Sequence, residues 1–450
     1  MAVAGFREMI DLLEKNGELV RVKKEVDHRF ELSAVAKKLE GGPALFFEKV
    51  RGYSMPVVVN TDYDRGIIAR ALGTTNPGLI DHYSLALKSP LDPVKVAGGP
   101  VKEVIRTTGI NLFRDLPIPV HYEKDGGPYI TTGLVVAELP ENNIRNVSYQ
   151  RLQATGEDEL RLLIQPRHLW AMYGEREKQG RPLEVAVVIG NDTACRLAGA
   201  TWGAAMPLGR DEFSIAGALR GRPVDLVRCE TIGVWVPAGA EIVIEGEILP
   251  GLRLPEGPFA EFTGNYGDPW DNPVIKVKAI THRREAIYHD LLTFSPEHHL
   301  LLGLPYEPVV FNTVKALVPG TLAAHVTPAS CGKFHAVVQI KKQHQGDGKD
   351  AIIAALSSVR DIKLVTVVDA DVDPFNPRDV EWAVATRFQA DRDLVLISGA
   401  KGNELDPSCP SLAVTAKMGL DATKPLDRSH RFDRITIPGY EGIDIKDYIL

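Results

Sequence analysis

Cysteine is scarce in this chain, and long apolar runs are absent. Four cysteines stand far apart, without the spacing of a metal-binding pair, at Cys195, Cys229, Cys331 and Cys409. We therefore expect a reduced, cytoplasmic chain without a structural zinc site. No apolar run approaches the length that crosses a bilayer, and the first residues lack an apolar signal core. Both absences argue against a membrane protein.

A basic segment is also missing. The net charge is −7 at pH 7 and no run of Lys or Arg occurs, so nucleic-acid binding has no electrostatic support. What is present is ordinary for a globular protein, with 44% hydrophobic and 25% charged residues. A chain of 450 residues is too long for one core, and two or three domains are expected.

Helix and strand patterns divide the chain into three parts. The first third alternates amphipathic helices with short strands, which is typical of a small α/β unit. The middle third is rich in strand patterns and turn signals, which favours a barrel or a sandwich. There Pro237-Ala-Gly-Ala240 predicts a hairpin between strands at 234–236 and 241–248, and a strand at 286–289 is expected to extend the same sheet. The last third returns to α/β, with Asn376 capping a helix.

Two carboxylates in residues 254–264, Glu256 and Glu261, are the first candidates for chemistry. They stand five residues apart, a spacing that directs them apart by roughly 140° on a helix and to opposite faces of a strand. They converge only if the backbone turns, and Gly257-Pro258 between them favours a turn. Beside apolar neighbours such a pair could be an acid/base dyad, because burial raises a carboxyl pKa. The spacing alone equally fits two solvated glutamates on a loop.

Asn146, His168 and Glu212 offer an amide oxygen, an imidazole and a carboxylate. This mixed set suits Mn²⁺ or Mg²⁺ beside a phosphate better than structural zinc, although spacing alone does not assemble it. The pair His298-His299 differs, because adjacent side chains on a helix point about 100° apart and do not chelate one metal. One of these histidines lining a pocket is the expectation.

Motifs along most of the chain, from about residue 110 to residue 425, resemble the UbiD family of prenylated-flavin-dependent decarboxylases. They occur in the family's order, and their combination is highly specific. The motifs are Asn146-Val-Ser-Tyr-Gln-Arg151, Glu212, Cys229-Glu-Thr with Val236-Pro-Ala-Gly-Ala-Glu-Ile-Val-Ile-Glu-Gly246, Glu256-Gly-Pro-Phe-Ala-Glu261 and Lys417-Met-Gly-Leu-Asp-Ala-Thr423.

The resemblance implies a multidomain α+β fold. A small N-terminal α/β domain would cover residues 1–110, and a central split β-barrel that binds prenylated FMN would cover residues 111–305. A C-terminal α/β domain, residues 306–450, would close the pocket and join copies into a homodimer or a homohexamer. The implied partners are a small carboxylic acid, CO₂ and a flavin prenyltransferase that supplies the cofactor.

The resemblance also implies a set of binding residues. Mn²⁺ bridging the flavin phosphate would be held by Asn146, His168 and Glu212. A K⁺ ion would lie near main-chain oxygens of Gly203, Ala204 and Met206, with Glu212 shared. The remaining cofactor contacts fall on Ser148, Tyr149 and Arg167, with Lys417 expected at the phosphate.

Catalysis is implied to rest on Arg151, Glu256 and Glu261. The substrate would form a covalent adduct with the prenylated flavin, CO₂ would leave, and Glu261 would return a proton to the carbon. Arg151 would hold a carboxylate and tune Glu256. The same steps run backward would carboxylate, so the physiological direction stays open.

The substrate is also open, within aromatic, heteroaromatic and α,β-unsaturated acids. His298 or His299 could hydrogen-bond a ring heteroatom or a second polar group of the substrate. This favours a compact aromatic or heteroaromatic acid as the substrate, such as a furan or pyrrole carboxylate. Two alternatives from other classes are a non-catalytic flavin- or metal-binding partner subunit and an ordinary FMN oxidoreductase. The acid–arginine set disfavours the first, and the absence of a recognisable nicotinamide site disfavours the second.

Overall fold

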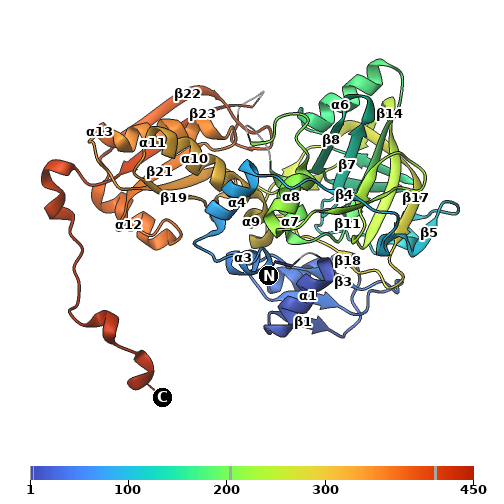
Figure 1. The fold of residues 1–450 in the computed structure, drawn as a ribbon, viewed down its shortest axis with the longest axis horizontal. Coiled ribbons are helices and arrows are strands. Elements are labelled where there is room, and N and C mark those ends of the chain that lie inside the picture. The colour runs from blue at the N-terminus through green and yellow to red at the C-terminus, as the bar shows by residue number, and fades with distance from the viewer. Residues whose placement is uncertain (1, 4, 202–204, 410–412, 450) are drawn as a thin grey trace.

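The computed structural model describes residues 2–3, 5–201, 205–409 and 413–449. Its N-terminal part is a four-stranded sheet, drawn in blue at the bottom of Figure 1, whose order is β1-β2-β3-β18. The strands are β1 (Leu19–Val22), β2 (Ala44–Phe47), β3 (Val57–Val59) and β18 (Tyr288–His289). The helices are α1 (Phe6–Lys15), α2 (Glu31–Lys38), α3 (Arg65–Ala71) and α4 (Leu79–Lys88).

The central part is built on a nine-stranded sheet, which runs β6-β9-β10-β17-β14-β11-β7-β8 with β5 paired to β17. Its strands are β5 (Val104–Arg106), β6 (Tyr129–Ile130), β7 (Leu134–Leu139), β8 (Ile144–Tyr149), β9 (Leu152–Gly156), β10 (Glu159–Leu162), β11 (Leu183–Ile189), β14 (Ile242–Glu256) and β17 (Trp270–His282). The helices are α5 (Leu112–Asp115), α6 (His168–Lys178), α7 (Thr193–Ala200) and α8 (Glu212–Arg220).

Two small sheets complete this part. One contains β4 (Val94–Lys95), β12 (Asp225–Arg228) and β13 (Trp235–Pro237), and the other β15 (Phe259–Ala260) and β16 (Tyr266–Gly267). Across the described residues the two ends of the large sheet, β6 and β8, do not pair with each other, so no closed barrel is found.

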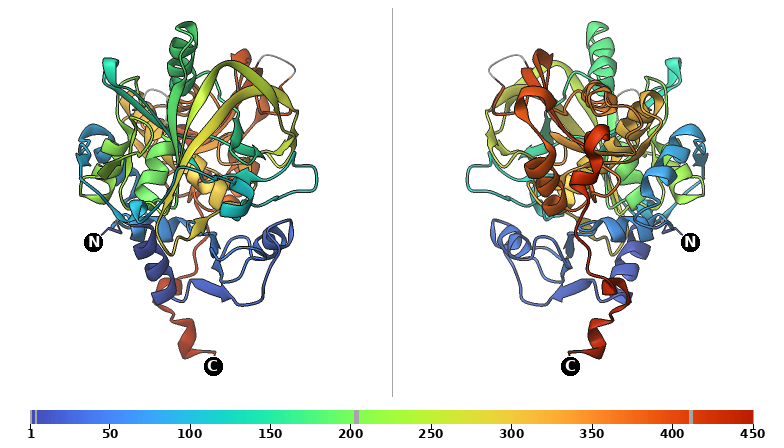
Figure 2. Two further views of the ribbon diagram at one scale, coloured as in Figure 1. Left: turned by 90° about the vertical axis from the view of Figure 1, so that its right-hand side faces the viewer. Right: turned by 90° about the vertical axis from the view of Figure 1, so that its left-hand side faces the viewer.

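The C-terminal part is a five-stranded sheet in the order β19-β20-β21-β23-β22. Its strands are β19 (Thr321–Val326), β20 (His335–Ile340), β21 (Leu364–Asp369), β22 (Leu394–Lys401) and β23 (Val414–Ala422). Its helices are α9 (Pro296–Gly303), α10 (Glu307–Leu317), α11 (Asp347–Ser358), α12 (Pro377–Arg387) and α13 (Ala390–Asp393). The segment after β23 runs away from the body, as Figures 1 and 2 show.

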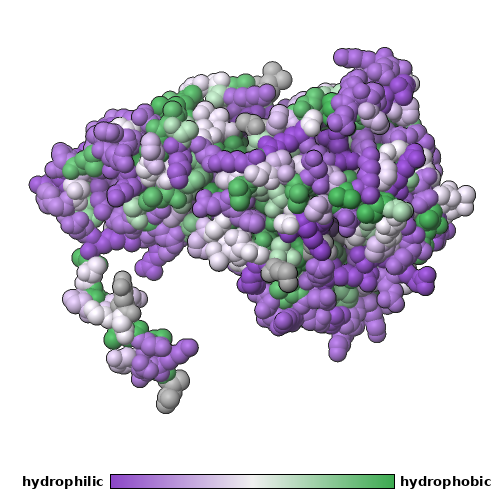
Figure 3. All heavy atoms as spheres, in the orientation of Figure 1, coloured by the Kyte–Doolittle hydropathy of each residue, from purple (hydrophilic) through white to green (hydrophobic). Residues whose placement is uncertain are grey.

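The N-terminal and central parts share two apolar cores, one between β2, β3 and the large sheet and one between α3, α4, α7 and α8, while the C-terminal sheet has its own. The face drawn in Figure 3 is largely hydrophilic with scattered apolar residues. Helix α9 and the 3₁₀ helix after it, η4 (Leu304–Tyr306), join the central and C-terminal parts. Leu300, Leu301 and Leu304 pack in the core beneath α7 and α8, while Tyr306 packs in the core of the C-terminal sheet. Within the described residues, no helix has both the length and the apolar character needed to cross a membrane.

Two strand predictions are wrong. The predicted hairpin at 237–240 does turn, with the Ala240 amide donating to the Pro237 carbonyl at 3.2 Å, but β13 pairs with β12 whereas β14 pairs with β11 and β17. A turn signal fixes the direction of the chain and not the partner of the strand that follows. Strand β18, expected in the central sheet, pairs with β3 of the N-terminal sheet instead.

Candidate active site

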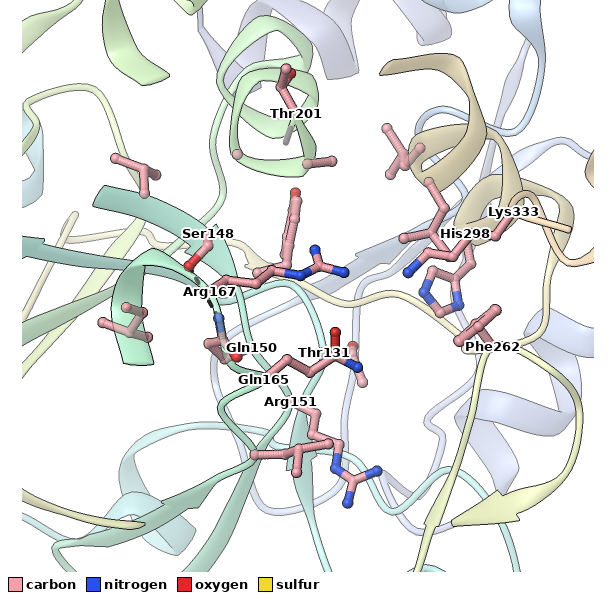
Figure 4. Close-up of a pocket in the computed structure, with 18 of the residues that line it drawn as sticks. Thr131, Ser148, Gln150, Arg151, Gln165, Arg167, Thr201, Phe262, His298 and Lys333 are labelled. Atoms are coloured by element: carbon pink, nitrogen blue, oxygen red, sulfur yellow. Dashed lines mark hydrogen bonds between the residues drawn. The ribbon is translucent and has the colours of Figure 1, made fainter. Parts of the chain in front are cut away.

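A cavity of about 380 Å³ lies between the end of the central sheet, helices α6 to α8, and helix α9 (Figure 4). Its wall comes from separate segments between Thr131 and Leu405, including a turn that precedes β20. The predicted residues that line it are Asn146, Ser148, Tyr149, Arg151, Arg167, His168, Met206, Glu212, Glu261 and His298. The structure thus brings together residues that the sequence spreads over more than 150 positions.

Arg151 connects the two glutamates. Strand β8 ends at Tyr149 and β9 begins at Leu152, and Arg151 lies in the break between them. Its Nε and one terminal nitrogen donate to the two oxygens of Glu256 at 3.0 and 2.7 Å, and its other terminal nitrogen donates to Glu261. The backbone turn predicted between the glutamates is present, with Gly257 at φ 106°, a conformation that favours glycine.

The two glutamates have different surroundings. Glu256 ends β14, is 0% exposed, and accepts two further hydrogen bonds, from the Tyr129 hydroxyl at 2.9 Å and the Asn272 amide at 2.9 Å. Glu261 is 6% exposed and lines the cavity. Burial raises the pKa of Glu261, and the positive charges of Arg151 and Lys333 oppose that rise. Glu261 is therefore the carboxyl that can meet a ligand in its protonated form.

The predicted metal ligands lie on three elements around the cavity. Asn146 is on β8, His168 is the first residue of α6, and Glu212 is the first residue of α8. Glu212 is 2% exposed and accepts from the Asn146 amide at 3.0 Å and from the Val147 backbone N–H at 2.9 Å. Burial raises the pKa of Glu212 to about 8.

Burial and the nearby Arg167 lower the pKa of His168, which keeps its imidazole neutral and able to coordinate a cation. Two oxygen donors and one neutral nitrogen fit Mn²⁺ or Mg²⁺. Across the described part of the chain no cluster of three His, Cys, Asp or Glu side chains occurs that could hold a metal.

Not every predicted residue joins the cavity. The Lys417 ammonium donates to the backbone carbonyls of Leu356 at 2.9 Å and Arg360 at 3.1 Å, and Lys417 is absent from the cavity wall. Gly203 and Ala204, predicted near a K⁺ ion, lie outside the described residues. His298 lines the cavity, whereas His299 is bonded through Nε2 to the Phe262 carbonyl at 2.9 Å.

Lys333 lines the same wall as His298 and was missed by sequence reasoning. It lies on a turn between a short 3₁₀ helix, η5 (Pro328–Ser330), and β20. No motif surrounds it in the sequence, and a single lysine on a turn is normally solvated. Lys333 comes about 30 residues after α9 in the sequence, and nothing in that spacing shows that its side chain points into the cavity.

Family models match nearly the whole chain. They are described as the N-terminal, Rift-related and C-terminal domains of 3-octaprenyl-4-hydroxybenzoate carboxy-lyase, and they cover residues 10–87, 93–296 and 299–422. A relative named anhydromevalonate phosphate decarboxylase, from Methanosarcina mazei, is 40% identical over 96% of this chain and 99% of its own.

Solved structures agree with this match. The UbiD-class enzyme HmfF from Pelotomaculum thermopropionicum, in complex with FMN, gives a TM-score of 0.96 at 46% identity and covers 99% of this chain and 100% of its own. An evolved dimeric form of that enzyme, in complex with prFMN, gives 0.92 at 44% identity with the same coverage. The apo 3,4-dihydroxybenzoic acid decarboxylase from Enterobacter cloacae gives 0.93 at 31% identity, covering 100% of this chain and 99% of its own.

Proposed function

Since this chain belongs to the UbiD family and is a decarboxylase of the carboxy-lyase class, we propose that it binds prenylated FMN and reversibly decarboxylates a small aromatic, heteroaromatic or α,β-unsaturated acid. The observation that carries this proposal is the pairing of Arg151 with Glu256 and Glu261 at the wall of the cavity. A carrier of flavin or metal has no need of a buried carboxyl with a raised pKa facing its ligand.

The residues present fit the cofactor and its metal. Asn146, His168 and Glu212 would hold Mn²⁺, and their buried oxygens and neutral imidazole suit it. We propose that Ser148, Tyr149, Arg167 and Met206, which line the cavity, lie along the flavin, and that K⁺ binds near Met206 and Glu212. When bound, the prenylated flavin would supply the electron sink that lets CO₂ leave without a free carbanion.

The protein's own residues would position the acid and move one proton. Arg151 would orient the substrate carboxylate, because its planar guanidinium is held rigidly by Glu256. Glu261 would deliver the proton to the carbon that CO₂ leaves, since it lines the cavity and burial raises its pKa, which favours its protonated form. The apolar walls around Phe259 and Leu301 would exclude water while this happens.

Two substrate classes follow from the names of similar proteins and from the cavity. His298 on the wall supports our preference for a compact aromatic or heteroaromatic acid, which agrees with the name of the Enterobacter decarboxylase. The relative from Methanosarcina carries the name of a phosphorylated substrate, and its 40% identity makes anhydromevalonate phosphate the second candidate. Both belong in one substrate panel.

We further propose three domains, residues 1–110, 111–305 and 306–450, with the central one a split barrel. The three family matches, residues 10–87, 93–296 and 299–422, support the two boundaries between these domains to within about 20 residues. We propose that copies of the C-terminal domain associate into a dimer or a hexamer, and that a flavin prenyltransferase supplies the cofactor.

Co-expression with a flavin prenyltransferase tests the proposal. The purified protein, supplied with Mn²⁺ and K⁺, should contain a flavin with the mass of prenylated FMN and should release CO₂ from at least one acid in the panel. Folded protein that takes up only unmodified FMN, and turns over no acid, would contradict it. Reduction of that FMN by a nicotinamide would then favour an oxidoreductase.

A further inference from the structure

Lys333 is a buried cation without a hydrogen bond. It is only 9% exposed, and Figure 4 shows its side chain directed from the turn before β20 into the cavity, beside His298. Its ammonium lies 4.6 Å from the centre of the Phe262 ring and 3.9 Å from the nearest carboxylate oxygen, on Asp361, which is beyond hydrogen-bond distance. Among the described residues no group accepts a hydrogen bond from it.

Asp361 offsets the charge of Lys333 only in part, because it lies 3.9 Å away and accepts no hydrogen bond from it. One of its oxygens accepts from the Tyr306 hydroxyl at 3.1 Å, and the other from Arg360 Nε at 3.3 Å. Its carboxylate is thus shared with closer donors. A buried ammonium that lacks hydrogen bonds is costly, and burial lowers the pKa of Lys333 to about 8. A ligand that brings a negative charge would remove that cost.

His298 presents a second unused polar atom beside this cation. Its Nδ1 is buried and has no hydrogen-bond partner. Burial lowers the pKa of His298, and Lys333 adds to this, which keeps the imidazole neutral and able to donate one hydrogen bond. Gly332 brings the two residues together, because its Cα packs against the His299 backbone on α9, where any Cβ would clash.

Lys333 and His298 lie on other elements than the catalytic and cofactor groups, although the charge of Lys333 acts on Glu261 and Asp361 lies beside both Lys333 and Arg167. Arg151 and its glutamates come from the β8–β9 break and the end of β14, whereas Lys333 and His298 come from the C-terminal turn and α9. In Figure 4 they lie across the cavity from Ser148 and Gln150 on the β8 side. The residues proposed for the flavin phosphate and its metal are on β8, α6 and α8.

We propose that Lys333 and His298 form an anion subsite that binds a second acidic group of the substrate, a carboxylate or a phosphate, apart from the carboxylate lost as CO₂. The inference rests on the proposed function, because it assigns the substrate class of that same cavity. The preferred substrates are dicarboxylic acids or phosphorylated unsaturated acids, and Lys333 determines the preference.

Matched substrates and variants of the holoenzyme test this subsite. A heteroaromatic dicarboxylic acid is compared with its monomethyl ester, and a phosphorylated unsaturated acid with the corresponding alcohol. Lys333→Met should lower the ratio of kcat/KM between the charged and the neutral member of a pair by about 10- to 100-fold, mainly through KM, since hydrogen bonds to charged groups are among the stronger ones. Lys333→Arg should restore part of the ratio. Lys315→Met, which removes an exposed lysine on α10, is the matched control.

Calorimetric binding of the same pairs gives a second readout that does not need turnover. Tighter binding of the charged member to the wild type than to Lys333→Met supports the subsite, even if no panel acid is decarboxylated and the proposed function fails. Equal ratios in the wild type and Lys333→Met would overturn it. If the dicarboxylic acid and its ester give the larger ratio, the subsite prefers a carboxylate. If the phosphorylated acid and its alcohol give the larger ratio, it prefers a phosphate.

Discussion

The charged groups at the two ends of the cavity differ in how fully they are hydrogen-bonded. Around Glu256 every carboxylate oxygen accepts two hydrogen bonds, from Arg151, Tyr129 and Asn272. Around Lys333 the ammonium has no hydrogen bond among the described residues, and the neighbouring His298 has an unpartnered nitrogen. A saturated network holds its geometry before the ligand arrives, whereas unsatisfied buried groups are completed by the ligand. The first end is thus suited to chemistry and the second to recognition.

Removing the proposed proton donor should have the largest effect on activity. Glu261→Gln keeps the size of the side chain but cannot donate a proton as an acid, and kcat should fall by about 10²- to 10⁴-fold. Single-turnover assays with the prenylated flavin quantified by mass would measure the loss. Glu247→Gln is the control, because Glu247 pairs with Lys278 outside the cavity. Turnover near the wild-type rate in Glu261→Gln, with cofactor bound, would remove Glu261 from the role of proton donor.

The network behind the donor should give a smaller effect. Tyr129→Phe removes the hydroxyl that donates to Glu256 and leaves a buried carboxylate oxygen one donor short. The free energy of unfolding should fall by about 1–3 kcal/mol, measured by urea denaturation. A loosened Arg151 should cost up to about tenfold in kcat/KM, the equivalent of about 1.4 kcal/mol.

Tyr53→Phe provides the comparison for that loss. Its hydroxyl also donates one hydrogen bond, to the Phe113 carbonyl at 2.6 Å, but at a partly exposed site where water can replace it. If both variants lose the same stability and neither loses activity, the saturation of Glu256 has no role in positioning Arg151.

The sequence predicted the chemical end far better than the recognition end. Glu256, Glu261 and Arg151 occur in recognisable motifs, and the glycine and proline between the glutamates predict the turn found at Gly257. A local signal also predicted the Asn376 cap of α12. Lys333 has no local signal, since its burial depends on the packing of one turn against a helix more than 30 residues earlier.

The sequence patterns also failed to predict which strands pair with each other. The alternation of apolar residues predicts that β13 and β18 are strands, but their partners, β12 and β3, are chosen by the whole fold. For the same reason the strand patterns favoured a barrel or a sandwich, while the pairing order leaves the central sheet unclosed over the described residues.

Moving the turn that carries Lys333, while leaving the Lys333 and His298 side chains in place, should have a smaller effect on substrate preference. Gly332→Ala adds a Cβ at φ 65°, and that carbon meets the His299 backbone, so the turn that carries Lys333 must shift. The preference for the second anion should weaken several-fold, and stability should fall by about 1–3 kcal/mol.

Gly251→Ala separates the two causes. Gly251 has a similar φ, 72°, but nothing lies within 4 Å of its added Cβ, so only the backbone strain of about 1 kcal/mol applies. Unchanged substrate preference in Gly332→Ala would show that the turn does not position Lys333.

The smallest expected effect is electrostatic and acts between Lys333 and Glu261. Burial raises the pKa of Glu261, and the charge of Lys333 opposes that rise. If Glu261 must be protonated to act, kcat falls as pH rises through its pKa. Lys333→Met removes an opposing charge, so the pKa of Glu261 should rise further and the alkaline limb of the kcat–pH profile should move to higher pH. Lys315→Met, whose charge is exposed on α10, should leave the limb in place. A limb that moves to lower pH in Lys333→Met would mean that a different group supplies the proton, and the electrostatic link between the two ends would be lost.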